Sequence, residues 1–158
     1  MDKESMGPTS VLFAKARRIY DGKWVEGSLI YIVNKTYGRV ISFIIPEGST
    51  GEHVGNELKS ISPCFSVIPA TICRCSEIRD YYERNIYQGD VIESLNTGEI
   101  YIVKYENGKF TAVNDNVKEL NLIDIASSMN IKGNILDKSM QDLFHTSKDV
   151  NMLVTDKE

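Results

Sequence analysis

The feature that most constrains this chain is a series of strand-forming segments separated by tight-turn pairs. Asn107-Gly108 stands between two segments rich in β-branched and aromatic residues, at 99–105 and 109–113. Asn-Gly favours the type I′ turn, because both central positions of that turn need a positive φ. With residues 90–94 and a turn that ends at Gly98, these segments predict a three-stranded antiparallel meander.

Further strands are expected along the rest of the chain. Asp21-Gly22 is a second tight-turn pair and marks the end of a β-prone segment at 11–20. The remaining strands are predicted at 27–33, 39–45 and 131–136, with a weaker β region at 58–75 that two prolines interrupt. A loop is expected at 46–56, and a charged connector of at most one helical turn at 76–85.

Helix signals are few and lie near the C-terminus. Positions 122, 125, 126 and 129 share one helical face, but the segment also fits a strand, and both interpretations stay open. Asn116 with Glu119 three residues later is a candidate capping box. Ser139, with Asp142 at N3, predicts a short final helix.

These elements predict a mainly β protein, α+β at most. The expected architecture is a small SH3-like or partly open β-barrel, or a sandwich, with a short C-terminal helix. We expect a disordered N-terminus at 1–10, one β-rich domain at 11–145 with sub-lobes at 11–70 and 86–145, and a flexible tail at 146–158. Two strands are apolar on both faces, so their second face meets either a barrel interior or another subunit.

Charge and hydropathy limit the partners. The 158 residues carry 18 Lys and Arg against 22 Asp and Glu, a formal net charge of −4. Nucleic-acid binding usually needs a basic surplus or a basic face, so it is disfavoured and rests on the local cations Lys15, Arg17, Arg18 and Lys23. No apolar run approaches the roughly 20 residues that span a bilayer, and the first ten residues lack a secretory layout. We therefore expect a cytoplasmic protein without membrane contact.

Catalytic patterns do not stand out. The chain has no P-loop, no G-x-G-x-x-G, no G-x-S-x-G and no H-E-x-x-H. Acid pairs such as Asp80 with Glu83, or Asp90 with Glu93, are expected by chance among 22 carboxylates and fit a solvated face. We expect no enzymatic activity and no cofactor.

The cysteines and histidines do not form a metal-site pattern. Cys73 and Cys75 would share one face of a strand, with Cys64 nine residues upstream. A structural zinc site needs four ligands, and His53 and His145 are far away in the sequence. Three free thiols in a reducing compartment are the expected state.

The most motif-like phrase, at 85–94, has a structural explanation. A glycine before a strand permits a positive φ, and an adjacent aspartate can accept backbone N–H bonds in the turn. We therefore assign structural turn roles to Gly89, Asp90, Gly98, Asn107, Gly108, Gly133 and Asn134. Tyrosines crowd near this phrase, and tyrosine is enriched at interfaces, although Tyr101 and Tyr105 also fit a core face. The candidate interaction surface comprises Tyr81, Tyr82, Tyr87, Arg74, Arg79, Arg17 and Arg18.

The segment TICRCSEIRDYYERNIYQGDVI, at 71–92, resembles the signature of the phage YopX family, T-[VI]-G-Q-Y-T-G-L-x-D-K-N-G-x-x-I-Y-E-G-D-[IV]-[VI]. IKGNILD near the end is similar to the closing I-G-N-I-Y-E of that family, and GKWVEGSLIYI to its W-x-x-G-x-L opening. The residues that match in the first segment are Thr71, Ile78, Asp80, Ile86, Tyr87, Gly89, Asp90, Val91 and Ile92.

The resemblance implies a predominantly β protein of phages, prophages or related mobile elements, located in the cytoplasm of a bacterial host. It implies no catalytic residues, since the family has no established biochemical function. Cys73, Arg74 and Cys75 stand where the family has Gly-Gln-Tyr, while Glu77 and Glu83 replace glycines. The turns of this loop are therefore expected to be built differently here.

Three functional hypotheses remain open. The first is a non-enzymatic accessory module of a phage that binds or assembles proteins and forms homo-oligomers, with a host or phage protein as a further candidate partner. The second is a β-barrel that binds nucleic acid through its local cations. The third is an anti-defence protein that inhibits a bacterial immune nuclease such as CRISPR or sequesters an immune signal.

Overall fold

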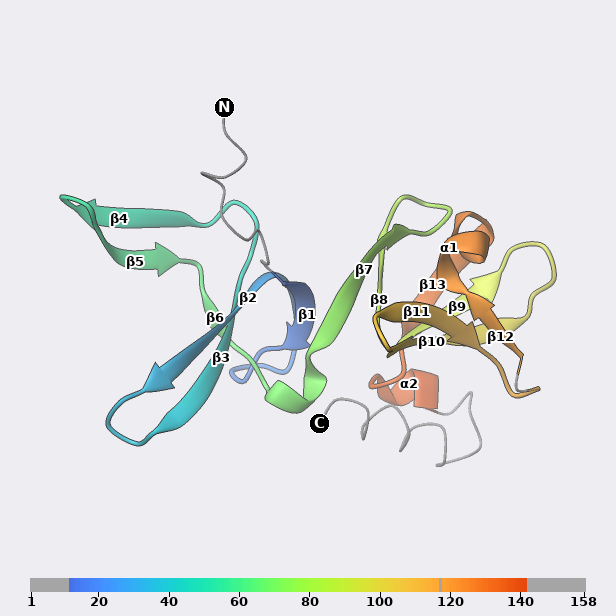
Figure 1. The fold of residues 1–158 in the computed structure, drawn as a ribbon, viewed down its shortest axis with the longest axis horizontal. Helices are drawn as coiled ribbons and strands as arrows, with labels where there is room; N and C mark the ends of the chain where they lie inside the picture. Colours follow the sequence, from blue (N-terminus) through green and yellow to red (C-terminus); the bar gives the residue numbers. More distant parts are fainter. Residues whose placement is uncertain (1–11, 117, 142–158) are drawn as a thin grey trace. The chain divides into compact units, whose positions relative to one another are not determined.

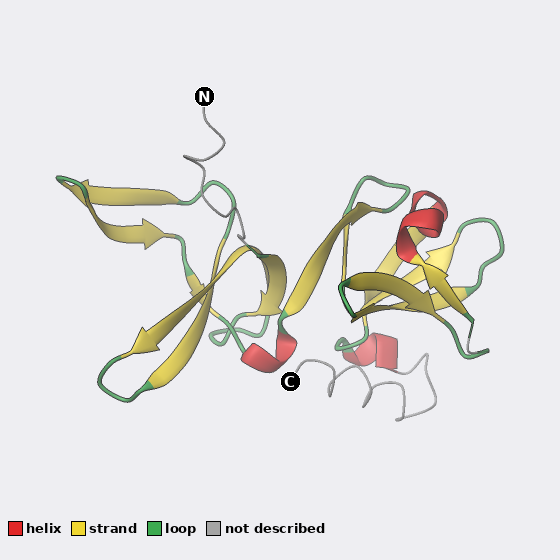
Figure 2. Ribbon diagram, viewed as in Figure 1, coloured by secondary structure: helices red, strands yellow, loops and turns green. Residues whose placement is uncertain are grey.

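The computed structural model describes residues 12–116 and 118–141, and the chain divides into two compact units (Figure 1). The first unit is Met1–Pro69 and the second is Ala70–Glu158. Strands dominate both, as Figure 2 shows, which confirms the prediction of a mainly β protein. The predicted disordered N-terminus at 1–10 and the predicted tail at 146–158 lie outside the described residues.

Four strands build the sheet of the first unit, in the spatial order β6-β3-β2-β1. They are β1 (Phe13–Arg17), β2 (Trp24–Asn34), β3 (Arg39–Ile45) and β6 (Phe65–Ser66). Their pairings are antiparallel. The Asp21-Gly22 turn joins β1 to β2, with Gly22 at φ 72° and the Asp21 carboxylate accepting the Lys23 N–H. Turn chemistry readable in the sequence therefore sets the first pairing.

Strand β2 changes partner at a glycine. Its first half pairs with β1 and its second half with β3, and Ser28 is paired on both sides. A Cβ on Gly27 would lie 2.1 Å from the carbonyl oxygen of Ile45, where backbone atoms cannot yield. Glycine at such a bend lets another strand approach closely. The small core beside it comprises Ala14, Ala16, Leu29, Ile44 and Val67.

A second hairpin of this unit was not expected from the sequence. The predicted loop at 46–56 is wrong, because β4 (Thr50–Val54) pairs with β5 (Glu57–Ser62) around Gly55, which has φ 63°. Every residue of β4 is exposed, so no alternation of apolar and polar side chains marks this strand. The pairing is local and rests on backbone hydrogen bonds that the side-chain pattern does not report.

The second unit contains a two-stranded pair and a five-stranded antiparallel sheet. The pair is β7 (Cys73–Arg79) with β8 (Asn85–Tyr87). The sheet has the order β12-β11-β10-β9-β13. Its strands are β9 (Asp90–Ser94), β10 (Ile100–Glu106), β11 (Lys109–Val113), β12 (Glu119–Asn121) and β13 (Met129–Asn134). The predicted meander is confirmed, with Asn107 at φ 52° and Gly108 at φ 77° in the turn between β10 and β11.

Short helical turns complete the chain. They are η2 (Pro69–Thr71), α1 (Leu122–Ile125), η3 (Ala126–Ser128) and α2 (Lys138–Gln141). The ambiguous segment at 122–129 is thus helical up to residue 128. The predicted capping box is wrong, because Glu119 lies in β12 and the N-cap of α1 is Asn121. A short C-terminal helix is present as α2, but the prediction that Ser139 opens it is wrong, because α2 begins at Lys138; Asp142 lies outside the described residues.

The larger core cluster of the second unit forms on one face of the five-stranded sheet, and a smaller one, with Val91, Ile102 and Ile135, lies on the other face. In the larger cluster, Ile92, Val103 and Ala112 are fully buried and contact Leu122 and Ala126 from α1 and η3. The charged connector predicted at 76–85 is wrong in its first part, since 73–79 is strand β7. Cys73 and Cys75 are buried while their neighbours are more exposed, so β7 packs through its cysteines rather than through the aliphatic residues that usually signal a strand.

Candidate interaction surface

One face of the β1–β2–β3 sheet carries large apolar side chains, none of which is fully buried among the described residues. Paired residues of neighbouring antiparallel strands point to the same side, so the register assigns each residue to a face. We call this face the outer face, since the opposite face holds Ala14, Leu29 and Ile44 of the core. All apolar members of the outer face are half-buried or exposed: Phe13, Trp24, Ile30, Ile32, Ile41, Phe43 and Ile45.

The outer face also holds two of the predicted cations. Lys15 Nζ lies 5.1 Å and the Arg17 guanidinium 4.7 Å from the centre of the Trp24 ring. Arg17 also donates to the carbonyl of Gly22 at 2.8 Å. A cation over an indole face is attracted by the ring quadrupole. The register therefore brings together Lys15, Arg17 and Trp24, three residues that the sequence separates by up to nine positions.

Arg18 makes different contacts from Arg17. Its guanidinium lies 4.6 Å from the centre of the Phe65 ring and forms an ion pair with Asp21. The hydrogen bond from Arg18 lowers the pKa of Asp21, and the same bond raises the pKa of Arg18. The pair lies at the surface, where water screens the charges, so it contributes little stability. Arg17 and Arg18, predicted as one surface, serve separate contacts.

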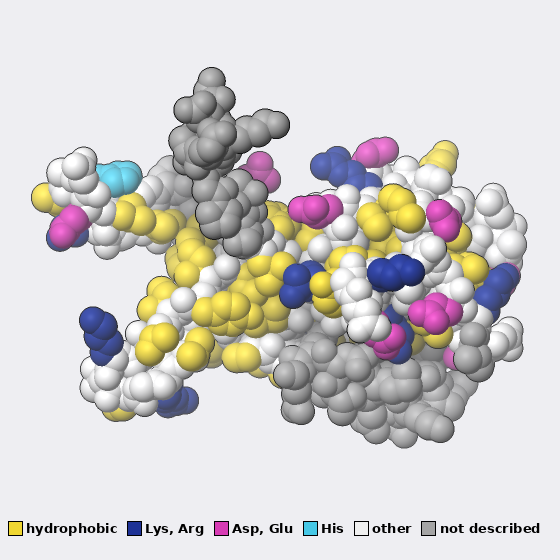
Figure 3. All heavy atoms as spheres, in the orientation of Figure 1, with side chains coloured by type: hydrophobic (Ala, Val, Ile, Leu, Met, Phe, Trp, Pro, Cys, Tyr) yellow, Lys and Arg dark blue, Asp and Glu magenta, His cyan; other side chains and the backbone are white. Residues whose placement is uncertain are grey.

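The far half of the β2–β3 hairpin is exposed on both faces. Tyr31, Val33 and Val40 are 58%, 62% and 60% exposed on one face, and Ile32 is 50% exposed on the other. Figure 3 shows hydrophobic side chains gathered over β2 and β3 and cations near the turn. The two-sided apolar pattern seen in the sequence thus has no covering layer within the described residues. Tyr31 is on the surface rather than in a core.

The predicted tyrosine surface is only partly present. Tyr81 and Tyr82 are exposed and meet edge to face, with ring centres 5.1 Å apart. The assignment of Tyr87 to this surface is wrong, because its side chain is 2% exposed. Tyr87 ends β8, just before the turn at Gly89, and its backbone N–H donates to the Asp90 carboxylate. Tyr101 is buried as well, and its hydroxyl donates to Glu99.

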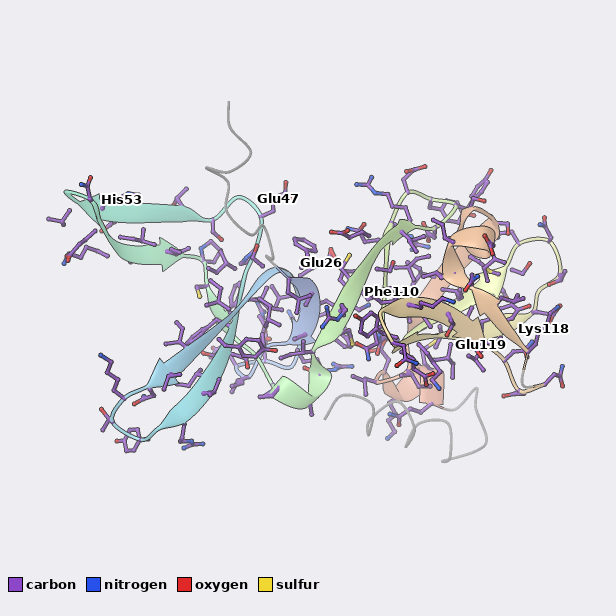
Figure 4. All side chains as sticks on the ribbon, in the orientation of Figure 1. Glu26, Glu47, His53, Phe110, Lys118 and Glu119 are labelled. Carbon is purple, nitrogen blue, oxygen red and sulfur yellow. The ribbon has the colours of Figure 1, made fainter. Side chains whose placement is uncertain are left out.

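The two arginines predicted near these tyrosines point to different partners. The Arg74 guanidinium lies 4.6 Å from the centre of the Tyr105 ring, and that ring packs on Phe110. Arg79 is exposed, and its ion pair with Glu83 is long at 4.0 Å. Figure 4 labels Phe110 beside this cluster. The structure therefore places Arg74 in an aromatic stack and leaves Arg79 on the surface.

The sequence did not reveal the role of Asp80, whose carboxylate holds the turn that carries Tyr81 and Tyr82 in place. The Asp80 carboxylate is fully buried and accepts the backbone N–H groups of Tyr82 and Arg84, at 2.9 Å each, and that of Ile131 at 3.3 Å. Burial alone would raise the pKa of Asp80, but these bonds and the Arg84 guanidinium outweigh it, and the pKa is lowered. The solvated face predicted for Asp80 is therefore wrong, and an aspartate before a charged turn gives little signal of this buried role.

Gly89 and Asp90 belong to a buried polar cluster. Asp90 accepts the Tyr87 N–H at 2.8 Å and the Asn134 side-chain amide at 3.0 Å. Gly89 has φ 84°, donates to Val103 and accepts from Ile135, both at 2.8 Å. Asp90 and Asn134 are 0% and 1% exposed, so neither can meet a substrate in this conformation. Asp90 accepts a backbone bond in the turn, which is the structural role its sequence context predicts.

The remaining glycines predicted in turns lie at a turn or at an irregularity in strand pairing. Gly98 has φ 76° in the turn between β9 and β10. Gly133 lies at the irregularity in the pairing of β13 with β9. Glu77 and Glu83, which stand where the YopX signature has glycines, adopt φ 62° and 63°. Positive φ is uncommon for residues other than glycine, so both positions keep a conformation that glycine favours.

The cysteines lie apart from metal-binding partners. Cys73 and Cys75 are buried and Cys64 is exposed, and these three cysteines form no disulfide. Cys73 accepts a weak hydrogen bond from the Asn134 amide at 3.7 Å. Among residues 12–116 and 118–141, no group of three or more His, Cys, Asp and Glu could hold a metal ion. His53 is exposed on β4 (Figure 4), and His145 lies outside the described residues.

No protein-family model matches this chain, and a search of curated proteins finds no similar sequence. The resemblance to the YopX family therefore stays a prediction. In the described part of the chain, no helix has the length and apolarity to cross a bilayer.

Proposed function

We propose that this protein is a non-enzymatic binding and assembly module that self-associates through the far half of the β2–β3 hairpin. The observation that carries the proposal is the exposure of Tyr31, Ile32, Val33 and Val40, at 50% or more each, in one continuous hairpin. Tyr31, Val33 and Val40 lie together on one face of the hairpin, and a contiguous exposed apolar patch marks an interaction site.

A second copy of the chain suits this hairpin as the occupant. Among the residues that the structure describes, β2 residues 30–34 pair only with β3, which leaves a backbone edge open there. An open edge is a template for pairing with another chain, and an antiparallel edge is complementary to itself. Two copies of β2 paired in this way would hold Lys35 of each copy at opposite ends. Like charges would therefore stay apart.

A charge in the hairpin should test the proposal. We expect wild-type protein at micromolar concentration to run as an oligomer in size-exclusion chromatography with light scattering. Val33→Lys should shift it to the monomer, because it places a charge in a desolvated contact. Val54→Lys is the matched control, since Val54 is 65% exposed on β4, outside the hairpin. A strictly monomeric wild type would contradict the proposal, and so would equal effects of the two variants.

Nucleic-acid binding is a second candidate, favoured by the placement of Lys15 and Arg17 over Trp24. Stacking aromatics with cations are the parts of single-strand binding sites. Residues 1–69 carry eight Lys and Arg against seven Asp and Glu, whereas residues 70–158 carry ten against fifteen. We expect labelled single-stranded DNA or RNA to bind at low salt and Arg17→Gln to weaken it. Absent binding to single- and double-stranded probes at low salt would exclude this candidate.

We further propose an origin in a phage or prophage, with a role in the cytoplasm of the bacterial host. Its support is the sequence resemblance together with the positive φ of Glu77 and Glu83, two positions where the YopX signature has glycine. Neighbouring genes test it: genes for phage replication, packaging or anti-defence functions are expected. The last class would favour the anti-defence hypothesis over general assembly. A neighbourhood of ordinary chromosomal genes would contradict the phage origin.

A further inference from the structure

A polar pocket lies at one edge of the five-stranded sheet in the second unit. Its volume is about 380 Å³. The residues around it are Glu106, Asn107, Lys109, Thr111, Glu119, Leu120 and Asn121. They come from β10, the turn after it, β11 and β12, and Figure 4 labels Glu119 and Lys118 at the β12 end. The sequence gives no sign of the pocket, because its residues form no recognised motif.

The strand register explains why these side chains converge. Thr111 is paired with Asn121, and Glu106 with Lys109, so these four residues share one face of the sheet. Glu119, two residues before Asn121, lies on the same face. The larger core cluster fills the opposite face, where Ala112 and Val103 are buried. The pocket thus lies at the polar end of this face, beyond the part where Ile102 packs with Val91 and Ile135.

Thr111 is the residue that marks this pocket as a binding site. Its side chain is 7% exposed, and its hydroxyl has no hydrogen-bond partner, the sole such buried side-chain atom among the described residues. Buried polar atoms almost always have a partner, so an exception calls for an explanation. A ligand group that enters the pocket and bonds to the hydroxyl would supply one.

The adjacent backbone edge is open as well. Among residues 12–116 and 118–141, β12 is the end strand of the sheet and pairs only with β11. The Asn114 N–H donates to the Lys118 carbonyl, and hydrogen-bonded pairs alternate along an antiparallel ladder. Leu120 therefore directs its backbone groups to β11, while Glu119 directs its own to the open edge. An extended peptide could bond there and place a side chain in the pocket, as in β-strand addition.

Charge decides which peptide fits. Glu119 forms no ion pair with any described residue, whereas Glu106 is paired with Lys104 at 2.7 Å. Lys109 is the cation of the lining, and it is exposed. The unit as a whole carries an excess of acid, with fifteen Asp and Glu against ten Lys and Arg. A basic side chain would find the Glu119 carboxylate, the Thr111 hydroxyl and the Asn121 amide oxygen as acceptors.

We propose that β12 and this pocket form a docking site for an extended peptide that carries lysine or arginine, added as a further strand of the sheet. The site is separate from the β2–β3 hairpin. Loss of self-association in Val33→Lys leaves it intact, and loss of peptide binding leaves self-association intact.

Fluorescence anisotropy of the full chain tests the site with a labelled, blocked nonapeptide of alternating threonine and lysine. We expect saturable binding, and we expect the glutamate analogue and an analogue with proline at the central position to fail. Glu119→Gln should weaken binding about tenfold, because a charge-assisted hydrogen bond is lost. Thr111→Val, which has the same shape without the hydroxyl, should weaken it by a factor of about three to ten.

Asp115→Asn is the matched control for charge, since Asp115 is an exposed carboxylate of the same unit outside the pocket. It should bind the lysine peptide as wild type does. The proposal is overturned if saturable binding is absent, if the proline analogue binds equally well, or if Asp115→Asn weakens binding as much as Glu119→Gln. Unchanged circular dichroism in both pocket variants ensures that a loss of affinity is not a loss of fold.

Discussion

The two units of this chain use the same strand chemistry with different degrees of burial. In the second unit, Ile86, Ile92 and Val103 are fully buried in one cluster. The buried carboxylates of Asp80 and Asp90 accept hydrogen bonds from the backbone N–H groups of Tyr82 and Tyr87. In the first unit the buried apolar residues are fewer (Ala14, Ala16, Leu29, Ile44 and Val67), and much of the β2–β3 hairpin is exposed. An isolated two-stranded hairpin is only marginally stable in water. This difference in burial is the support for the self-association that we propose for the first unit.

The largest expected difference comes from one substitution made in both units. Ile92→Ala, at a fully buried site, should lower the free energy of unfolding by about 3 to 4 kcal/mol, because it leaves a cavity. Ile32→Ala, at a site 50% exposed, should change it by no more than about 0.5 kcal/mol in the monomer. Urea denaturation at low protein concentration measures both. Equal effects would contradict the contrast between the units.

Asp90→Ala should have the next largest effect, about 3 kcal/mol of lost stability. The change leaves the Tyr87 N–H and the Asn134 amide without their acceptor in a buried place. Chemical denaturation followed by circular dichroism reports the loss. Trp24, the one tryptophan of the chain, gives a separate fluorescence signal from the first unit. An Asp90→Ala protein as stable as wild type would show that the aspartate has another role.

Thr111→Val should act in the opposite direction and raise stability by about 1 kcal/mol. The substitution replaces an unpartnered buried hydroxyl with a methyl group of the same shape. Thermal denaturation without peptide measures the gain. Thr97→Val, the same substitution at an exposed turn position, is the control and should not stabilise. A destabilised Thr111→Val would mean that the hydroxyl is bonded in solution.

The smallest expected effect is a difference in acid sensitivity. The pKa of Asp80 is lowered in the fold, so its contribution to stability is present above the unfolded pKa and is lost as the pH falls through the folded pKa. Asp80→Asn should therefore lose less stability than wild type between about pH 5 and about pH 2. The pKa of Asp21 is also lowered, but its pair with Arg18 lies at the surface. Asp21→Asn should therefore change the pH dependence of stability less than Asp80→Asn does. The midpoints of urea denaturation of wild type, Asp80→Asn and Asp21→Asn, measured across this pH range, test the expectation.

Much of the fold could be predicted because it rests on local signals. The expected bounds of β3, β9 and β11 agree with the structure, since turn pairs or turn glycines flank runs of strand-forming residues there. The sequence missed β4, whose residues are all exposed, and the second half of β7, because the weaker β region predicted at 58–75 ends at Cys75. The alternation of apolar and polar residues reveals a strand only where one face carries the usual apolar side chains, so it did not reveal β4 or the second half of β7.

The candidate sites divide in the same way. Residues adjacent in the chain were enough to specify the turn at Gly89-Asp90, the Asn107-Gly108 hairpin and the two-sided apolar character of β2 and β3. The three-dimensional fold was needed to show that Tyr87 is buried, that Lys15 and Arg17 share Trp24, and that Thr111 faces a pocket. These facts depend on strand register. Register is set by pairing between distant segments, and a shift of one residue would turn every side chain to the other face.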